Sequence, residues 1–302
     1  MRRTTLAAAQ NPSVRRFVSR HGMRLGAARF VAGETLDDAV TALRRLNEQG
    51  LYANTTLLGE DTASAGEAAA VVEEYGRILE RLRDEQLRAN VALKLTHLGL
   101  DLGEEVAYTN VERLVTRARE LGNFVRIDME SSAYTEATLA IYRRLREAGH
   151  DNVGTVLQSY LYRTPDDLEA LLPLQPNLRL VKGAYLEPPE VAHQDKSDVD
   201  AAYVRLLERM LAEGVYTCVA THDERMIEHA IAFADSHDIE SDRFEFQMLY
   251  GVRPRLQLDL AGRGFKVLVA TPYGPEWFPY LMRRLAERPA NLGFVLRNLV
   301  RS

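Results

Sequence analysis

Eight short stretches rich in valine, leucine, isoleucine and aromatic residues recur along the chain, and helical periodicity fills the gaps between them. The predicted strands are 51–58, 90–95, 123–129, 153–158, 178–183, 215–220, 243–249 and 265–270. The predicted helices are 64–87, 104–121, 135–148, 165–172, 198–213, 224–236, 253–262 and 276–287, after a first helical stretch that begins at Thr35. Strands that alternate with helices form parallel sheets, and eight repeats without a long linker favour a closed (βα)8 barrel of the TIM type. An open doubly wound α/β sheet is the alternative.

The predicted organisation is one barrel domain over residues 35–302, preceded by extra N-terminal helices in a basic segment over residues 1–34. Between Met1 and Gly33 there are seven arginines and no Asp or Glu. Such a segment is typical of a surface helix packed on the domain, of a basic helix that rests on anionic lipid, or of an organellar transit peptide. No stretch approaches 18 uninterrupted apolar residues, so no segment is expected to span a membrane.

The composition narrows the classes of partner and compartment. The net charge of −5 and the isoelectric point near 5.9 argue against a nucleic-acid-binding surface. The single cysteine, Cys218, cannot form an intrachain disulfide, which fits a reducing compartment such as the cytoplasm. Because Cys218 lies in an apolar predicted strand, we expect a buried, unreactive thiol.

The sequence lacks a dinucleotide-binding fingerprint. Gly262 and Gly264 come nearest to GxGxxG, but Val267 stands where the third glycine belongs. There is also no GxxxxGK[ST] loop, so a Rossmann nucleotide site is not expected.

Polar side chains collect at the carboxyl ends of the predicted strands, where the active sites of (βα)8 barrels lie. They are Glu60, Lys94, Asp128, Gln158, Arg179, Lys182, Thr221, His222, Asp223 and Gln247. Burying unpaired polar groups costs several kcal/mol, so folding alone does not explain the pattern. A ring of structural ion pairs is the alternative for Lys94 and Asp128. The histidines lack the spacing of a metal site, so no metal is expected.

The last predicted helix is amphipathic. Its apolar arc holds Trp277, Phe278, Leu281, Met282 and Leu285, and its other side holds Tyr280, Arg283, Arg284 and Glu287. The paired arginines form either a solvated surface or a grip on a small carboxylate. Cations outnumber acids at the predicted barrel mouth, which favours an anionic ligand such as a carboxylate or a cofactor that carries phosphates.

Seven segments that carry these residues resemble, in order, sequences of the proline dehydrogenase family: LKLTHLGLDL, VRIDMESS, VLQSYLYRT, LRLVKGAYLEP, ATHD, RFEFQMLYGVR and PYLMRRLAERP. The similarity runs from about Ala32 to the C-terminus and is greatest to the small monofunctional bacterial enzymes. It implies a distorted (βα)8 barrel that binds FAD without a Rossmann fold.

The resemblance also implies a role for each site residue. Arg283 and Arg284 would bind the substrate carboxylate with the help of Lys94, and Tyr280 and Tyr185 would wall the substrate pocket. Asp128 would be the active-site acid, and Arg179 would lie beside the flavin N5 as the second catalytic residue. The residues implied to contact FAD are Met129, Gln158, Arg179, Lys182, Gly183, Ala184, Thr221, His222 and Glu287. Glu60 resembles a gate residue that pairs with Arg283 when the substrate is bound.

Three positions depart from the family pattern. Ala270 stands where tyrosine is frequent, near the substrate ring, so we expect Ala270 to line a wider substrate pocket. Thr56 replaces a common aspartate and His97 a frequent glutamine, and neither is expected to touch the chemistry.

The resemblance implies oxidation of L-proline to 1-pyrroline-5-carboxylate, the first step of proline catabolism, with hydride transfer to flavin N5. It further implies a quinone as electron acceptor, peripheral contact with the inner face of the membrane, and a pyrroline-5-carboxylate dehydrogenase as partner. Three alternatives stay open: a relaxed-specificity dehydrogenase of hydroxyproline and other cyclic amino acids, a Schiff-base aldolase or lyase that uses Lys94 or Lys182, and a binding barrel without catalysis.

Overall fold

Eight parallel strands close into one barrel. The structure, a computed structural model, describes residues 27–287, with side chains as far as Met282. The strands are β1 (Tyr52–Leu57), β2 (Ala89–Leu93), β3 (Val125–Ile127), β4 (Val153–Gln158), β5 (Asn177–Val181), β6 (Tyr216–Ala220), β7 (Phe244–Leu249) and β8 (Val267–Tyr273). Each strand pairs with the next and β8 pairs with β1, so the sheet has no free edge.

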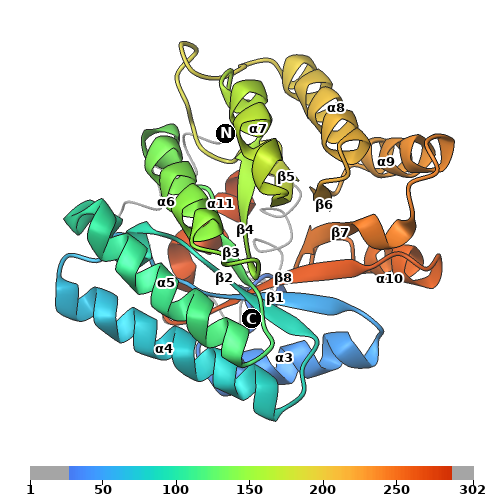
Figure 1. Cartoon of the computed structure of the whole chain (residues 1–302). Coiled ribbons are helices and arrows are strands. Elements are labelled where there is room, and N and C mark those ends of the chain that lie inside the picture. The colour runs from blue at the N-terminus through green and yellow to red at the C-terminus, as the bar shows by residue number, and fades with distance from the viewer. Residues whose placement is uncertain (1–26, 288–302) are drawn as a thin grey trace.

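Helices alternate with the strands, and all but the last of them surround the barrel (Figure 1). They are α3 (Leu36–Glu48), α4 (Ala65–Asp84), α5 (Glu104–Glu120), α6 (Thr135–Glu147), α7 (Thr164–Leu171), α8 (Lys196–Ala212), α9 (Glu224–Ser236), α10 (Pro254–Gly262) and α11 (Trp277–Glu287). Local capping fixes some of their starts. Thr35 and Asp38 form a capping box at α3, and the Ser64 side chain accepts a hydrogen bond from the Glu67 backbone at α4.

The predicted (βα)8 barrel is confirmed, and each predicted strand and helix has a counterpart in the structure. β8 continues past Ala270, where the predicted strand ends, because its pairing with β1 extends to Tyr273 opposite Leu57. Residues 1–26 of the predicted basic segment lie outside the described residues. Within the described range, one 3-10 turn (Ala27–Arg29) precedes α3.

The outside and the inside of the barrel differ in polarity. Outside, the apolar faces of the helices pack on the strands in one continuous core, with Leu43, Leu79 and Tyr203 fully buried. (βα)8 barrels are usually filled by branched apolar residues. This barrel interior instead holds buried polar side chains that bond across it, as Arg179 Nη2 does to Asn54 Oδ1 at 3.2 Å.

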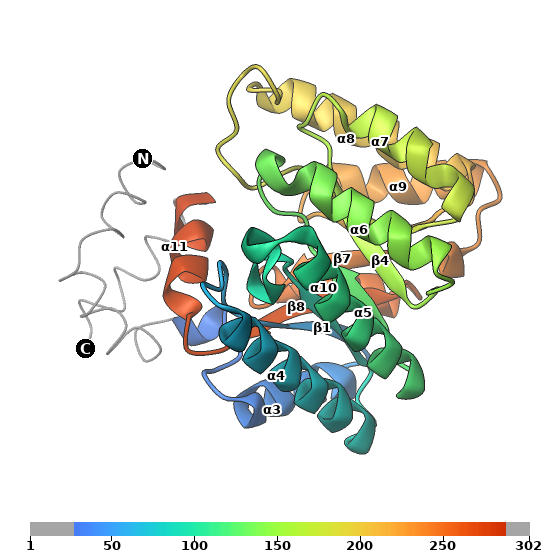
Figure 2. The same ribbon diagram turned by 60° about the vertical axis from the view of Figure 1, so that its left-hand side comes forward.

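A second, smaller core holds α11 at one end of the barrel. Trp277 and Leu281 of this helix pack against Phe30, and Trp277 Nε1 donates to Glu34 Oε1 at 2.8 Å. The predicted apolar arc is confirmed for Trp277, Phe278, Leu281 and Met282, whereas the side chain of Leu285 lies outside the described residues. Figure 2 shows α11 beside the end of the barrel, outside the ring of helices. This position of the last helix is a distortion of the regular (βα)8 arrangement.

Candidate active site

Two cavities open at the carboxyl ends of the strands. The first has a volume of about 630 Å³ and lies between the β1–α4 loop and α11. The second has a volume of about 530 Å³ and lies over the ends of β3 to β7. The residues that line both are Lys94, Asp128, Arg179, Leu249, Ala270 and Tyr280. The two cavities therefore meet at this set of side chains.

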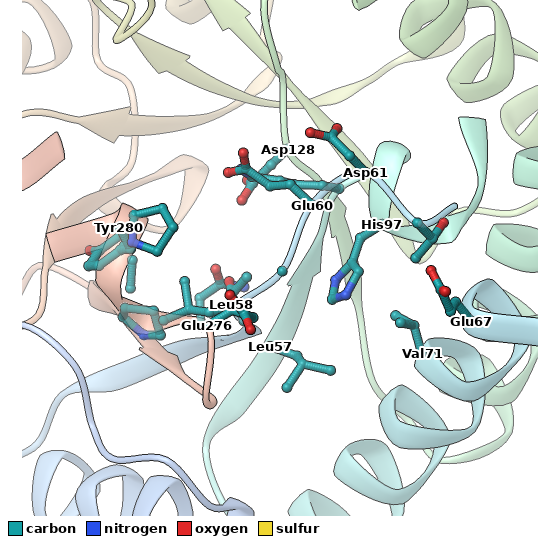
Figure 3. A pocket seen from close by; sticks show the side chains of 18 of the residues that line it. Leu57, Leu58, Glu60, Asp61, Glu67, Val71, His97, Asp128, Glu276 and Tyr280 are labelled. Carbon is teal, nitrogen blue, oxygen red and sulfur yellow. The ribbon is translucent and has the colours of Figure 1, made fainter. Parts of the chain in front are cut away.

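Figure 3 shows the first cavity from close by. Tyr280 reaches in from α11 on one side, and Glu60 extends from the β1–α4 loop toward Asp128 on the other. The predicted substrate-pocket residues with described side chains thus come together. Lys94, Ala270 and Tyr280 line both cavities, and Tyr185 lines the second.

Arg179, on β5, lies where the cavities join and is 9% exposed. Its Nη1 donates to Asp128 Oδ1 at 2.5 Å, its Nη2 to Asn54 Oδ1 at 3.2 Å, and its Nε to Gln247 Oε1. Burial lowers the pKa of the Arg179 guanidinium, and the negative charge of Asp128 opposes that shift. An arginine side chain stays charged in proteins, so these contacts hold a fixed cation at the barrel mouth.

Lys94 follows β2 and forms an ion pair with Glu60. The β1–α4 loop that carries Glu60 is also tied to the segment after β2, because the backbone and the hydroxyl of Thr62 both donate to Thr96 O at 3.2 Å. The predicted gate residue is therefore held close to Lys94. The side chain of Arg283, its predicted partner, lies outside the described residues.

The His97 ring packs against this loop at Gly59. A Cβ added to Gly59 would lie 2.3 Å from His97 Nε2, so the ring leaves no room for a side chain there. Burial, together with the positive charge of Lys94, lowers the pKa of His97 to about 4. The ring is thus neutral at pH 7 and packs as an uncharged group. It lines the first cavity, although no role at the site was expected for His97.

The second cavity gathers the residues predicted to contact a flavin. Those with described side chains all line it: Met129, Gln158, Arg179, Lys182, Gly183, Ala184, Thr221 and His222. Val156, Val181 and Ala220 add apolar surface between them. A cavity lined by both apolar surface and hydrogen-bonding groups suits an organic ligand that carries polar substituents.

Ion pairs and hydrogen bonds orient several of these side chains. Lys182 Nζ lies 2.5 Å from Asp200 Oδ1 and 3.5 Å from Asp223 Oδ2. His222 Nε2 accepts a hydrogen bond from Leu249 N at 2.9 Å, which leaves Nδ1 to carry the proton when the ring is neutral. These contacts fix the orientation of the side chains in the cavity wall.

Gly183 occupies a position that other residues rarely adopt. Its φ is +118°, and an added Cβ would lie 2.4 Å from Tyr160 Cδ1. The glycine allows the backbone after β5 to turn along the cavity while Tyr160 packs against it.

The positive surplus predicted at the barrel mouth is not found among the described side chains. Lys94, Arg179 and Lys182 each have a carboxylate partner, and Lys182 has two. The prediction omitted Asp200, which lies on α8, because its approach to Lys182 depends on tertiary packing. The side chains of Arg283, Arg284 and Glu287 lie outside the described residues, so the paired arginines remain a prediction.

Other features narrow the chemistry. Cys218 is fully buried, and burial raises the pKa of its thiol to about 12, as expected for an unreactive group. Both lysines considered as nucleophiles are engaged in ion pairs, whereas a Schiff-base lysine needs a free neutral amine. In the part of the chain that the structure describes, no group of three or more His, Cys, Asp or Glu side chains could hold a metal ion.

Several site residues were missed, and one was left without a role. Leu249 lines both cavities, and Asn54 accepts from Arg179. Gln247 was noted at a strand end, but not its contact with Arg179. Alternation along β7 could have shown that Glu245 and Gln247 share the inner face, because they fall between buried apolar neighbours.

The fold and the site define a class: this protein is a (βα)8 barrel with a candidate active site at the carboxyl ends of the strands. A family profile described as proline dehydrogenase matches residues 39–297. The chain belongs to the proline dehydrogenase family.

Two relatives match over nearly their whole length. Proline dehydrogenase 1 of Bacillus subtilis (strain 168) is 44% identical over 301 residues, which cover 100% of this chain and 99% of the relative. Proline dehydrogenase of Deinococcus radiodurans is 42% identical over 304 residues, which cover 99% of this chain and 98% of the relative. The chain therefore matches the monofunctional enzymes in extent as well as in sequence.

Solved structures show the same fold in larger proteins. The crystal structure of proline utilization A (PutA) from Bdellovibrio bacteriovorus inactivated by N-propargylglycine has a TM-score of 0.80 and 24% identity. The match covers 86% of this chain and 32% of that one. A mutant PutA from Bradyrhizobium japonicum has a TM-score of 0.75 and 23% identity, with 95% and 33% covered. This chain thus spans about a third of the PutA chains, and these likenesses show the fold.

Proposed function

We propose that this enzyme catalyses the FAD-dependent oxidation of L-proline to 1-pyrroline-5-carboxylate, the first step of proline catabolism. One observation carries the proposal: the cavity lined by the residues predicted to contact a flavin and the cavity between the β1–α4 loop and α11 meet at Lys94, Asp128, Arg179, Ala270 and Tyr280. A substrate that lay at this junction would contact both the charged groups and the ligand of the second cavity.

The second cavity fits FAD in the chemistry of its walls. Met129 and Val181 would face the ring system, and Gln158, Thr221 and His222 offer hydrogen-bonding groups around it. Lys182, held by two carboxylates, and the backbone at Gly183 and Ala184 would bind the more polar part, with Glu287 on the flavin side of the last helix. FAD, when bound, supplies an N5 atom that accepts hydride.

The chain's own residues would position the substrate. Arg283 and Arg284 would clamp the carboxylate through charge-assisted hydrogen bonds, with Lys94 as a third cation. Tyr280 would pack against the ring, and Glu60 would close the first cavity by pairing with Arg283. These contacts would hold the reacting carbon of the substrate in a fixed orientation. Such orientation lowers the entropic part of the activation barrier, and much of the rate enhancement would arise from it.

Asp128 and Arg179 would organise the reacting centre. Asp128 fixes the Arg179 guanidinium through the 2.5 Å ion pair, and Arg179 in turn would lie beside the flavin N5. A fixed cation at that point favours the build-up of negative charge. The substrate amine must be neutral to release hydride, so kcat/KM should rise from neutral to alkaline pH.

We also propose that a quinone accepts the electrons and that the basic N-terminal segment contacts the inner face of the membrane. No helix within residues 27–287 is long and apolar enough to cross a membrane. A pyrroline-5-carboxylate dehydrogenase is a proposed partner, in line with the name of one relative, the bifunctional protein PutA of Escherichia coli.

Ala270 supports a second candidate function, the oxidation of 4-hydroxyproline and other cyclic amino acids. Ala270 lines both cavities, where a tyrosine would add a ring and a hydroxyl. Turnover of L-proline and 4-hydroxyproline should be compared in one preparation, with Ala270→Tyr as the matched variant. Relaxed specificity predicts similar kcat/KM for both substrates and a shift toward proline in A270Y. A strong proline preference in the unaltered enzyme would reject this candidate.

The identity of the cofactor tests the proposal itself. The purified protein should be yellow and release FAD on denaturation, and it should reduce a redox dye when L-proline is added. A colourless protein without dye reduction would overturn the proposed function.

A further inference from the structure

Polar side chains form a chain of contacts inside the barrel that ends at Arg179. Lys266 Nζ lies 2.7 Å from Glu245 Oε2, and Tyr216 donates its hydroxyl to the same carboxylate oxygen at 2.9 Å. The other oxygen of Glu245 accepts from Gln247 Nε2, and Gln247 Oε1 accepts from Arg179 Nε. The contacts join the amino-terminal end of the barrel to the site where the cavities meet.

The hydrogen-bonding properties of Glu245 and Arg179 allow only one orientation of the Gln247 amide between them. Burial alone would raise the pKa of Glu245, but Lys266, Gln247 and Tyr216 bring it below its ordinary value, so Glu245 is ionised. An ionised carboxylate can only accept, so Gln247 presents Nε2 to it. Arg179 can only donate, so Gln247 presents Oε1 to Arg179.

Burial makes this orientation persistent. Glu245 and Gln247 are 3% and 4% exposed, so the amide cannot exchange its partners for water. Gln247 also completes a three-point support of the planar guanidinium. Arg179 Nε, Nη1 and Nη2 donate to Gln247 on β7, Asp128 after β3 and Asn54 on β1, respectively.

We propose that Gln247, held in one orientation by Glu245, is a positioning residue for Arg179. It fixes the rotation of the guanidinium, and thereby aims the Nη groups at Asp128 and at the junction of the cavities. The proposal rests on the proposed function in one respect, which is that Arg179 acts on the bound flavin and substrate.

Two substitutions separate the links. Gln247→Leu keeps a similar volume but removes the acceptor for Arg179 Nε. Glu245→Gln keeps the shape but lets the residue at 245 donate, so the Gln247 amide can turn and face Arg179 with a second donor. Thr55→Val is the control, because Thr55 is also buried. Its hydroxyl donates to Thr271 O at 3.1 Å, and this hydrogen bond is not part of the chain of contacts from Lys266 to Arg179.

The first readout needs neither flavin nor substrate. In ¹⁵N-arginine-labelled protein, with the resonance assigned through Arg179→Lys, we expect slow solvent exchange of the Arg179 Nε–H. Exchange should accelerate by about tenfold or more in Q247L and in E245Q, and stay unchanged in T55V. The second readout is kinetic. The kcat for proline should fall roughly tenfold to a hundredfold in Q247L at full FAD content, with a smaller change in KM, and stay near the original value in T55V.

The outcomes are distinguishable. Unchanged Nε–H exchange together with unchanged kcat in Q247L would overturn the proposal. The proposal would also be overturned if Q247L and T55V lost kcat and thermal stability to the same extent. If Q247L does not fold, E245Q decides in the same way, because it alters no volume. If the unaltered protein does not oxidise proline, the proposed function fails, while the exchange measurement still decides whether Gln247 positions Arg179.

Discussion

Asp128 and Arg179 join β3 to β5 through an ion pair of 2.5 Å, at the point where the two cavities meet. The Asp128 side chain is 23% exposed and that of Arg179 is 11% exposed, so the pair is shielded from water but still open to a ligand. This placement makes the pair a part of the candidate site as well as of the fold.

Asp128→Asn should therefore impair both stability and catalysis. The substitution keeps the shape but leaves the buried Arg179 charge without its counter-ion, at a cost of about 1–3 kcal/mol in unfolding free energy. A misplaced guanidinium should lower kcat by roughly tenfold to a hundredfold. Urea denaturation and flavin reduction by proline measure the two effects.

Glu73→Gln is the matched control for this substitution. It removes one negative charge from the exposed pair of Glu73 with Arg113, and should change stability by less than about 0.5 kcal/mol. A D128N enzyme with the original kcat would show that the pair has no part in the chemistry.

The contact between Gly59 and His97 predicts a rescue experiment. In Gly59→Ala the new methyl group would lie 2.3 Å from His97 Nε2, so the His97 ring or the loop that carries Glu60 must move. We expect a destabilisation of about 1–3 kcal/mol and a raised KM for proline. His97→Ala in the same chain removes the ring and should restore most of the KM. Equal KM values in the single and the double variant would refute the role assigned to this contact.

Gly183→Ala and Gly262→Ala should differ sharply. At Gly183 the φ of +118° and the nearby Tyr160 ring both oppose a side chain, so G183A should unfold at a lower temperature and retain less FAD. At Gly262, the last residue of α10, an added Cβ meets nothing within 4 Å, so G262A should be neutral or stabilising by up to about 1 kcal/mol. Calorimetry measures the unfolding temperature of each variant, and the flavin-to-protein absorbance ratio measures its FAD content. Equal losses in the two variants would contradict the interpretation.

His97 should make stability depend on pH in a defined window. Its pKa falls from 6.5 to about 4 in the folded protein, so the unfolded chain binds the proton more readily. The unfolding free energy therefore has its full value, as far as His97 is concerned, above pH 6.5. It decreases by roughly 3 kcal/mol as the pH falls from 6.5 toward 4, because protonation of His97 favours the unfolded chain. His97→Gln cannot titrate, so the unfolding free energies of the two proteins should diverge over this range. Parallel curves would show that His97 is not buried in the neutral form.

Much of the fold was predictable because its signal is local and repeated. Each strand is a short apolar run and each helix has a polar and an apolar face, so their alternation defines a barrel without long-range information. The end of β8 was not predictable, since Pro272 normally argues against a strand interior and only the pairing with β1 carries the strand to Tyr273.

The site was predictable to the extent that its residues end strands or match family segments. The partners that neutralise them were harder to foresee. Asp200 reaches Lys182 from α8, and Asn54 reaches Arg179 across the barrel, and neither proximity is visible in sequence spacing. The chain of contacts from Glu245 through Gln247 had a local signal in the alternation of β7, but its meaning depends on which strand lies opposite.

An anaerobic titration with L-proline, followed through the flavin absorption, tests the central claim most directly. If the barrel mouth holds the substrate carboxylate so that the reacting carbon faces the flavin, proline should abolish the absorption of the oxidised flavin in the unaltered enzyme. Arg283→Met should need a far higher proline concentration at unchanged FAD content. Flavin that proline does not reduce, or equal proline requirements in both proteins, would contradict the account.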